Sequence, residues 1–189
     1  MKKKKIIVGI TGASGAIYAE SIIKRLNELK DQVSDLGIVF SDNAVRVREL
    51  ELGTNEVSFS FGNVYNNNDF FAPFASGSSQ YDTMIICPCS MGTLGRIAHG
   101  YADDLISRTA DVMLKENKKL ILLVREMPYN QIHIENFNLL ARSGAIICPA
   151  SPSFYSKPAS IDALINTVTD KLLLLAGFDI ETYKWGDKK

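Results

Sequence analysis

Residues 5–18 read Lys-Ile-Ile-Val-Gly-Ile-Thr-Gly-Ala-Ser-Gly-Ala-Ile-Tyr, and this stretch decides the fold. The apolar run Ile6–Val8 is typical of a buried parallel strand. Glycines at positions 9, 12 and 15 then predict a tight turn, and a helical pattern begins at Ala16. Backbone N–H groups at a helix start, together with the positive end of the helix dipole, form an anion site. The stretch therefore predicts a strand–turn–helix unit that holds the phosphate of a cofactor.

The spacing of the glycines separates two kinds of cofactor. A dinucleotide fingerprint has the pattern G-x-G-x-x-G and an acidic residue at the end of the second strand, which binds a ribose. Here the pattern is G-x-x-G-x-x-G, and the expected second strand, residues 33–40, is followed by Ser41 and then Asp42. A serine suits a phosphate oxygen better than a ribose diol, so NAD is disfavoured but stays open. The alternative without a cofactor is a glycine turn that only lets the helix pack closely on the strand.

Length and composition are those of an ordinary folded protein. The chain has 189 residues, 46% of them hydrophobic, and a formal net charge of zero. It is long enough for a sizeable core, and its charge balance argues against a nucleic-acid surface. We expect a single domain over residues 1–189, with residues 1–5 and about 178–189 as tails.

Two features bear on the compartment. The apolar run after the lysines at positions 2–5 ends at Gly9, which is too short for a signal sequence or a membrane span. The three cysteines, Cys87, Cys89 and Cys148, form no C-x-x-C motif and cannot all pair with each other. Reduced thiols and a cytoplasmic location fit best. Cys89 could be a nucleophile, but a packed thiol is the simpler interpretation.

Strand and helix patterns alternate along the chain. Further apolar strands are expected at residues 84–87, 120–124 and 145–148, and helices at 16–30, 42–52, 104–115, 134–142 and from 160 onward. This alternation predicts an α/β fold with a doubly wound parallel sheet between two helical layers, of the Rossmann or flavodoxin-like kind. Asp42 is expected to cap the second helix. The last helix is expected to turn one face to the core, formed by Ile161, Leu164, Ile165, Val168, Leu172 and Leu175.

Two more stretches reach the edge of the sheet where parallel strands end. Residues 88–95 read Pro-Cys-Ser-Met-Gly-Thr-Leu-Gly, which again places small and hydroxyl residues between a strand and a helix. Arg125 and Glu126 follow the strand 120–124. Ligands of open α/β sheets bind at this edge, so we expect these residues beside the glycine turn.

Two segments allow a structural and a functional interpretation. In the helix 104–115, Asp104/Arg108 and Asp111/Lys115 have the spacing of surface ion pairs, whereas Arg108 and Lys115 on one face could serve an anionic ligand. The stretch 70–74, Phe-Phe-Ala-Pro-Phe, lies in the least regular part of the sequence, residues 53–80. Its aromatic residues could line a pocket or a subunit contact, or anchor a surface loop.

With these residues in place, the chain resembles the flavin prenyltransferase family of the UbiX type, from Gly9 to about Gly177. Each matching piece is short, and the ordered set at family-like spacing carries the resemblance. Related flavin-dependent cysteine decarboxylases share the fold but have Pro-Ala-Ser-Ala-Asn-Thr where this chain has Pro-Cys-Ser-Met-Gly-Thr. The matching pieces are residues 9–18, 75–78, 88–94, 104–116, 124–128 and 152–155.

The resemblance implies a reaction, a cofactor and an assembly. Reduced FMN is alkylated at N5 and C6 by dimethylallyl phosphate, and the prenylated FMN that forms is used by a UbiD-type decarboxylase. The family assembles as homo-dodecamers with the flavin at a subunit junction, and neither metal, nucleic acid nor membrane is implied.

The resemblance also implies the roles of single residues. Glu126 and Ser14 would be catalytic, with Glu126 handling proton transfer. Fixed cations and a phenol hydroxyl would stabilise the charge on the departing phosphate. FMN would be held by Gly12, Ala13, Ser14, Ser41, Ser90, Met91, Gly92, Thr93 and Arg125. Dimethylallyl phosphate would be held by Lys115, Arg125, Tyr155 and Lys171, the last at a position where Arg also occurs.

Three other functions stay open on the sequence. The first is a flavin oxidoreductase or decarboxylase on the same fold, against which the sequence lacks the motif of the cysteine decarboxylases. A short-chain NAD(P) reductase, suggested by residues 11–15, needs Tyr-x-x-x-Lys, which the sequence does not contain. The third is a non-catalytic FMN carrier subunit of a decarboxylase. In the sequence, only the presence of Glu126, Lys115 and Tyr155 favours a flavin prenyltransferase over such a carrier. The donor is either a prenyl monophosphate or a diphosphate, and the pathway served is open.

Overall fold

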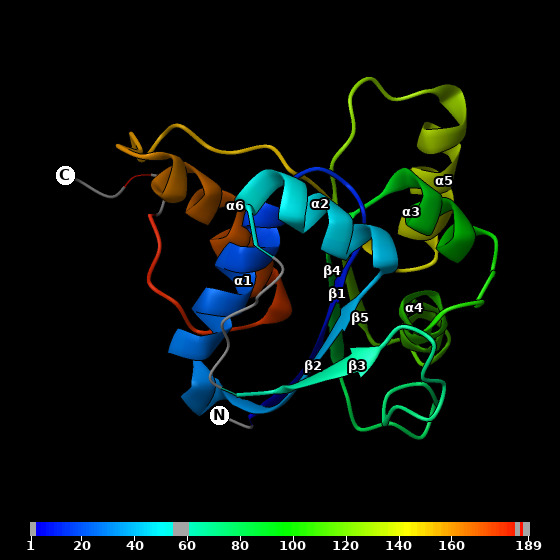
Figure 1. Cartoon of the computed structure of the whole chain (residues 1–189). Coiled ribbons are helices and arrows are strands. Elements are labelled where there is room, and N and C mark those ends of the chain that lie inside the picture. Colours follow the sequence, from blue (N-terminus) through cyan, green and yellow to red (C-terminus); the bar gives the residue numbers. More distant parts are fainter. Residues whose placement is uncertain (1–2, 55–60, 184–185, 187–189) are drawn as a thin grey trace.

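A six-stranded parallel sheet forms the centre of the protein (Figure 1). The computed structural model describes residues 3–54, 61–183 and 186. Neighbouring strands are all parallel, in the order β3-β2-β1-β4-β5-β6. The predicted α/β fold with a doubly wound parallel sheet is therefore confirmed. The strands are β1 (Lys4–Ile10), β2 (Val33–Phe40), β3 (Asn63–Asn66), β4 (Thr83–Cys89), β5 (Lys119–Val124) and β6 (Ile146–Pro149).

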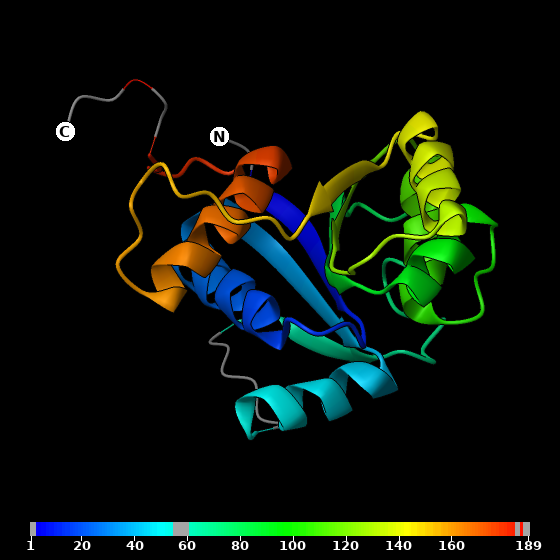
Figure 2. The ribbon, with the colours of Figure 1, turned by 90° about the horizontal axis from the view of Figure 1, so that it is seen from above.

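Helices cover both faces of the sheet, as Figure 2 shows from above. Helices α1 and α6 pack on one face, with α2 beside α1, and α3, α4 and α5 pack on the other. Strand β1 shows the cause, because Ile6 and Val8 point into one core and Ile7 into the other, with the period of two that a strand imposes. The helices are α1 (Ala16–Glu28), α2 (Asp42–Leu52), α3 (Met91–Ala98), α4 (Leu105–Lys115), α5 (Gln131–Arg142) and α6 (Ile161–Ala176).

The direction of winding reverses between β1 and β4. From β1 the chain continues to β2 and β3 on one side, whereas β4, on the other side of β1, is followed by β5 and β6. At such a reversal the connections that leave the two central strands diverge, and ligands of open α/β sheets bind in the crevice between them. The fold therefore assigns the candidate site to the loops after β1 and β4.

Several boundaries differ from the expected ones. Lys4 and Lys5 belong to β1 rather than to a tail. Phe178 is 3% exposed, and the N–H of Asp179 donates to Oε1 of Gln32 at 2.9 Å, so the expected C-terminal tail is docked where it begins. The remaining parts of the two expected tails include residues 1–2, 184–185 and 187–189, which lie outside the described residues.

The irregular segment 53–80 contains a strand that the sequence did not predict. β3 is four residues long and forms the edge of the sheet, where Val64 is 52% exposed. A short, polar edge strand lacks the apolar run by which buried strands are recognised. Residues 55–60 of this segment lie outside the described residues.

Two helices also differ in detail. Ser41, not Asp42, caps α2, because its Oγ accepts the N–H of Ala44 at 3.2 Å. Ile161 of α6 is 71% exposed, so its assignment to the core face is wrong. The buried stripe of α6 begins one turn later, at Ile165, and includes Thr169, Leu173 and Ala176.

The ion pairs expected within α4 form differently. Asp104 is the N-cap of the helix, and its side chain accepts an N–H of the first turn. Arg108 pairs instead with Asp111, at 3.6 Å, and Lys115 with Glu116, at 3.4 Å. The expected i,i+4 pairs are therefore wrong. The Asp104 carboxylate caps the helix, and Arg108 and Lys115 each pair with an acid that is nearer in the sequence.

Candidate active site

Four loops meet at the edge where the strands end. The Oγ1 of Thr11, after β1, donates to the carbonyl of Pro88 at 2.8 Å and accepts the N–H of Ser90, after β4, at 2.8 Å. The N–H of Ser41, after β2, donates to the carbonyl of Ile10 at 2.9 Å. One hydroxyl and one backbone contact thus fasten three loops to each other.

The loop after β5 joins them through Arg125. Its Nε donates to the carbonyl of Ser14 at 2.9 Å. Glu126, the next residue, is half-buried, and its Oε1 accepts the N–H of Met127 at 3.0 Å. The structure therefore brings Arg125 and Glu126 to the same edge as the loops that carry Ser14, Ser41 and Ser90.

A residue that no sequence pattern singled out fills the N-terminus of α1. The carboxylate of Glu51, from the last turn of α2, accepts the N–H groups of Gly15 at 2.9 Å and Ala16 at 2.8 Å. Burial raises the pKa of this carboxyl, but hydrogen bonds from Ser14 and both N–H groups, with the charge of Arg125, outweigh burial and lower the pKa. The expectation that the α1 N-terminus holds a cofactor phosphate is wrong, because the protein's own anion occupies it.

The N-terminus of α3 is open by contrast. Ser90 caps the helix, and its Oγ accepts the N–H of Thr93 at 3.3 Å. A Cβ built on Gly92 would meet no atom within 4 Å, so the first turn faces open space. The uncapped N–H groups of such a turn attract anions. This turn fits the phosphate of a flavin nucleotide better than α1 does.

Two glycines of the first loop are required by the turn itself. A Cβ on Gly12 would lie 2.4 Å from the Cβ of Asn43, in the first turn of α2. Gly15 has a φ of 114°, which side-chain-bearing residues rarely adopt. The glycine spacing is thus explained by packing against α2 and by backbone conformation, independently of any ligand.

Lys115 lies at the opposite edge of the sheet. It is the last residue of α4, and β5 begins at Lys119 and runs for six residues towards Arg125. At about 3.3 Å per residue, the two edges are roughly 20 Å apart. Lys115 and its partner Glu116 lie against Gly77, in the loop before β4. Within one chain, Lys115 therefore does not join the residues at the carboxyl edge.

Tyr155 and Lys171 are exposed and belong to the region around α6. Lys171 lines a groove of about 400 Å³ together with Ser153 and Tyr183. Tyr155 is 65% exposed, in the loop between β6 and α6. The charge of Lys171 also acts on the nearby Cys148, at the end of β6. Both predicted substrate residues are therefore accessible from solvent.

The thiols of β4 are packed. Cys87 and Cys89 are both fully buried, and burial raises the pKa of Cys89 to about 12 and raises that of Cys87 as well. A thiol in this state is not a nucleophile at neutral pH. The interpretation of Cys89 as a packed thiol is therefore confirmed, and Cys148 is half-buried.

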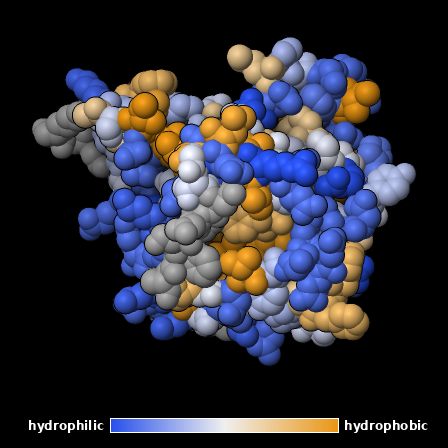
Figure 3. Space-filling model, viewed as in Figure 1, coloured by the Kyte–Doolittle hydropathy of each residue, from blue (hydrophilic) through white to orange (hydrophobic). Residues whose placement is uncertain are grey.

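The aromatic loop after β3 divides between core and surface. Phe74 is fully buried and meets Tyr65 and Tyr81 edge to face, at centroid distances of 4.9 and 5.2 Å. Phe70 and Phe71 are 46% and 99% exposed. Figure 3 shows an apolar hollow below α2, over the strands of the sheet. One phenylalanine thus anchors the loop, and two remain available for contact.

Metal-ligand clusters and membrane-spanning helices are both absent from the described ranges. Within residues 3–54, 61–183 and 186, no group of three or more His, Cys, Asp or Glu residues is gathered for a metal ion. In the same ranges, no helix has the length and apolar character needed to cross a membrane.

Comparisons with known proteins agree with the fold. The model of the Flavoprotein family matches residues 1–173. The flavin prenyltransferase UbiX of Methanocaldococcus jannaschii is 44% identical over 185 residues, which cover 96% of this chain and 98% of that protein. The crystal structure of AnUbiX (PadA1) in complex with FMN and dimethylallyl pyrophosphate has a TM-score of 0.87 and 37% identity, over 98% of this chain and all of that chain.

A third relative is a dodecameric FMN-dependent UbiX-like decarboxylase from Escherichia coli O157:H7. Its structure has a TM-score of 0.86 and 36% identity, over 97% of this chain and all of that chain. The identities are well above the level at which only a fold is shared, and they extend along the whole chain. The protein therefore belongs to the Flavoprotein family, and within it to the flavin prenyltransferases of the UbiX type.

Proposed function

We propose that this protein is a flavin prenyltransferase, which transfers the dimethylallyl group of dimethylallyl phosphate to N5 and C6 of reduced FMN. The observation that carries the proposal is the meeting of Ser14, Ser41, Ser90 and Arg125 at one edge of a fold that matches AnUbiX, a protein solved with FMN and a prenyl donor. When bound in its reduced form, the flavin supplies the electron-rich ring that accepts the prenyl group.

The loops after β1, β2, β4 and β5 hold FMN in this proposal. Its phosphate binds at the N-terminus of α3, because Glu51 already occupies that of α1. The Oγ of Ser90 donates to Oγ1 of Thr93 at 3.1 Å, which leaves the threonine proton for a phosphate oxygen. Arg125 adds a positive charge close to the same edge. The proposed FMN residues are Gly12, Ala13, Ser14, Ser41, Ser90, Met91, Gly92, Thr93 and Arg125.

The prenyl phosphate is bound by Lys115, Arg125, Tyr155 and Lys171. Because Lys115 lies at the far edge of its own chain, it reaches the site only from a neighbouring subunit. The dodecameric E. coli relative supports such a junction, and we propose the same assembly here. Cations gathered around the departing phosphate stabilise the charge that develops on it, and positioning of the two reactants supplies most of the remaining acceleration.

Three side chains at the edge can move protons. Glu51 is ionised and hydrogen-bonded to the hydroxyl of Ser14, so it can accept a proton through that hydroxyl. Glu126 is half-buried beside Arg125, where a carboxylate can take up or return a second proton. Closing the ring would need one proton added to the double bond of the prenyl group and one removed from the flavin carbon that is alkylated, so one of these carboxyl groups would donate a proton and the other would accept one.

The product and its use complete the proposal. Prenylated FMN leaves the enzyme and is taken up by a UbiD-type decarboxylase, and both proteins act in the cytoplasm.

A second candidate is an FMN-dependent decarboxylase, since the E. coli relative is described in those words. One experiment separates the possibilities. The protein is incubated anaerobically with reduced FMN and dimethylallyl phosphate, or the diphosphate, and the released flavin is analysed by mass spectrometry. We expect FMN that carries one added dimethylallyl group. In a parallel incubation with an aromatic acid and no prenyl donor, release of carbon dioxide would identify a decarboxylase. FMN that stays bound and unchanged in both incubations would identify a carrier.

A further inference from the structure

Helix α2 is held on the protein with little apolar burial. Of its residues, Ala44 and Arg48 are the buried ones, whereas Val45 is 39% and Leu50 86% exposed. Most helices are stabilised by packing an apolar face against the body of the protein. On α2 the central buried side chain is instead a charged one.

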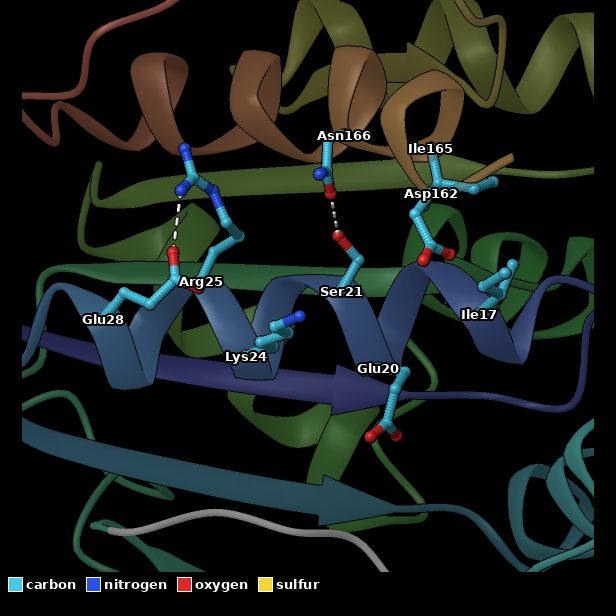
Figure 4. A pocket seen from close by; sticks show the side chains of 9 residues that line it. All are labelled: Ile17, Glu20, Ser21, Lys24, Arg25, Glu28, Asp162, Ile165 and Asn166. Atoms are coloured by element: carbon cyan, nitrogen blue, oxygen red, sulfur yellow. Dashed lines mark hydrogen bonds and ion pairs between the residues drawn. The ribbon is translucent and has the colours of Figure 1, made fainter. Parts of the chain in front are cut away.

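Arg48 is paired with a residue of α1. Its Nη1 lies 2.6 Å from Oε2 of Glu20, and the two side chains are 5% and 39% exposed. In the view along the groove between α1 and α6, Ser21 and Arg25 point towards α6, while Glu20 points away from it (Figure 4). Burying a guanidinium is strongly unfavourable unless a carboxylate accompanies it. The pair therefore ties α2 to α1 at this point.

A second polar contact between the same helices lies one turn further. Arg48 and Glu51 are three residues apart on α2, and Glu20 and Ala16 are four apart on α1, so each pair shares a helix face. Glu51 belongs to the last turn of α2, which ends at Leu52. Helix ends fray, so the position of a side chain there depends on what holds the preceding turn.

We infer that Arg48 is a positioning residue: its ion pair with Glu20 holds the last turn of α2 so that the carboxylate of Glu51 stays on the N–H groups of Gly15 and Ala16. The inference rests on the proposed role of Glu51 in proton transfer. Arg48 acts through Glu51 and touches neither reactant. A purely structural Arg48 would stabilise α2 without controlling where this carboxylate lies.

Hydrogen exchange of the full-length protein, read by mass spectrometry, tests the positioning without using activity. Glu51→Ala should raise exchange in peptides that cover residues 12–18, because Gly15 and Ala16 lose their acceptor. Arg48→Met should raise it to a similar extent, and combining both changes should add nothing. Arg46→Met, which removes an exposed charge from the same helix, is the matched control and should leave this exchange unchanged.

Turnover at saturating donor tests the consequence. Arg48→Met should lower turnover roughly tenfold to a hundredfold, as a displacement of about 1 Å does at a reacting group. In the Glu51→Gln background the same change should alter turnover by less than about twofold, since two residues that act as a unit are not additive. Arg48→Lys keeps the charge and should restore part of the loss. If Arg48→Met does not fold, Glu20→Gln breaks the same pair at a partly exposed position.

The outcomes decide separately on the inference and on the proposed function. Wild-type exchange over residues 12–18 in Arg48→Met, or an equal loss of turnover in both backgrounds, would overturn the inference and leave Arg48 as a stabilising residue. Wild-type turnover in Glu51→Gln would remove the proposed proton-transfer role of Glu51, and the exchange data would still decide whether Arg48 positions it.

Discussion

The carboxylate of Glu51 accepts the backbone N–H of Ala16 at 2.8 Å, although the two residues are 35 positions apart in the chain. A side chain of α2 thereby satisfies the first turn of α1, a role that usually falls to a capping residue of the helix itself. No such cap is present on α1, because its N-cap residue is Gly15. The contact closes a helix start and, at the same time, keeps a carboxylate charged next to Ser14.

This contact predicts how stability depends on pH. The folded-state pKa of Glu51 is lowered, so its contribution is fully present above the unfolded value near 4.5 and is lost as pH falls through the folded value. We expect Glu51→Gln to lower the melting temperature at about pH 7 and the difference from wild type to shrink towards about pH 3. Glu49→Gln, an exposed change on the same helix, is the control. A difference that stays constant with pH would contradict the prediction.

Replacement of Glu126 separates binding from chemistry. Glu126→Gln keeps shape and hydrogen-bonding capacity but cannot take up a proton, so FMN should bind nearly as well while turnover falls roughly a hundredfold or more. Flavin titration and single-turnover prenylation measure the two quantities. Glu135→Gln, on the surface of α5, should change neither. Wild-type turnover in Glu126→Gln would mean that Glu126 is only the polar end of β5.

Replacement of Lys171 should act on substrate affinity instead. Lys171→Ala removes a charged contact to the prenyl phosphate, and we expect a loss of about 1.5–3 kcal/mol in apparent donor affinity, seen in KM. Lys24→Ala, which changes another exposed lysine, on α1, is the matched control. An unchanged KM with a reduced kcat would place Lys171 in the chemical step and contradict the assignment.

Mixed oligomers test whether the site is shared between subunits. Lys115→Ala and Arg125→Ala each remove one part of a shared site, so each protein alone should be nearly inactive. When the two are dissociated, mixed and reassembled, some junctions contain both intact residues and activity should return. A mixture that remains as inactive as its parts, with mixed particles verified by native mass spectrometry, would place both residues in the same chain's site.

Thiol labelling tests the packing of β4. The pKa of Cys89 is raised to about 12 by burial and Cys148 is only half-buried, so an alkylating reagent should modify Cys148 first in the native protein. Cys87 and Cys89 should react only after unfolding. Mass spectrometry of peptides after timed labelling gives the order, and rapid labelling of native Cys89 would show that β4 opens easily.

The sequence predicted the central strands because their signal is local. Runs such as Ile6–Val8 and 120–124 are continuous and apolar, as strands buried on both faces must be. β3 was missed because an edge strand with exposed side chains has no such run. Ser41 and Asp42 are both good caps, and only the backbone conformation at Ser41 decides between them.

The candidate site was predictable where it follows the ends of strands. Ser14, Ser41, Ser90 and Arg125 all come directly from loops whose place the topology dictates. Glu51 has no local signal, since it lies on a polar helix and finds its partners across 35 residues. The remoteness of Lys115 from Arg125, by contrast, follows from the predicted helix 104–115 and strand 120–124, because a helix that leads into a parallel strand ends at the opposite edge of the sheet.

The contacts that fasten the loops to each other span most of the chain. Thr11 meets the loop after β4 across 77 and 79 residues, and Arg125 meets Ser14 across 111. A chain that ends before β5 would keep the glycine turn but would lack Arg125 and the hydrogen bond by which it joins the loop after β5 to Ser14. Cofactor binding is therefore a property of the finished sheet, and FMN, by binding the complete fold alone, stabilises it through mass action. Flavin occupancy can thus serve as a measure of how far a newly made chain has folded.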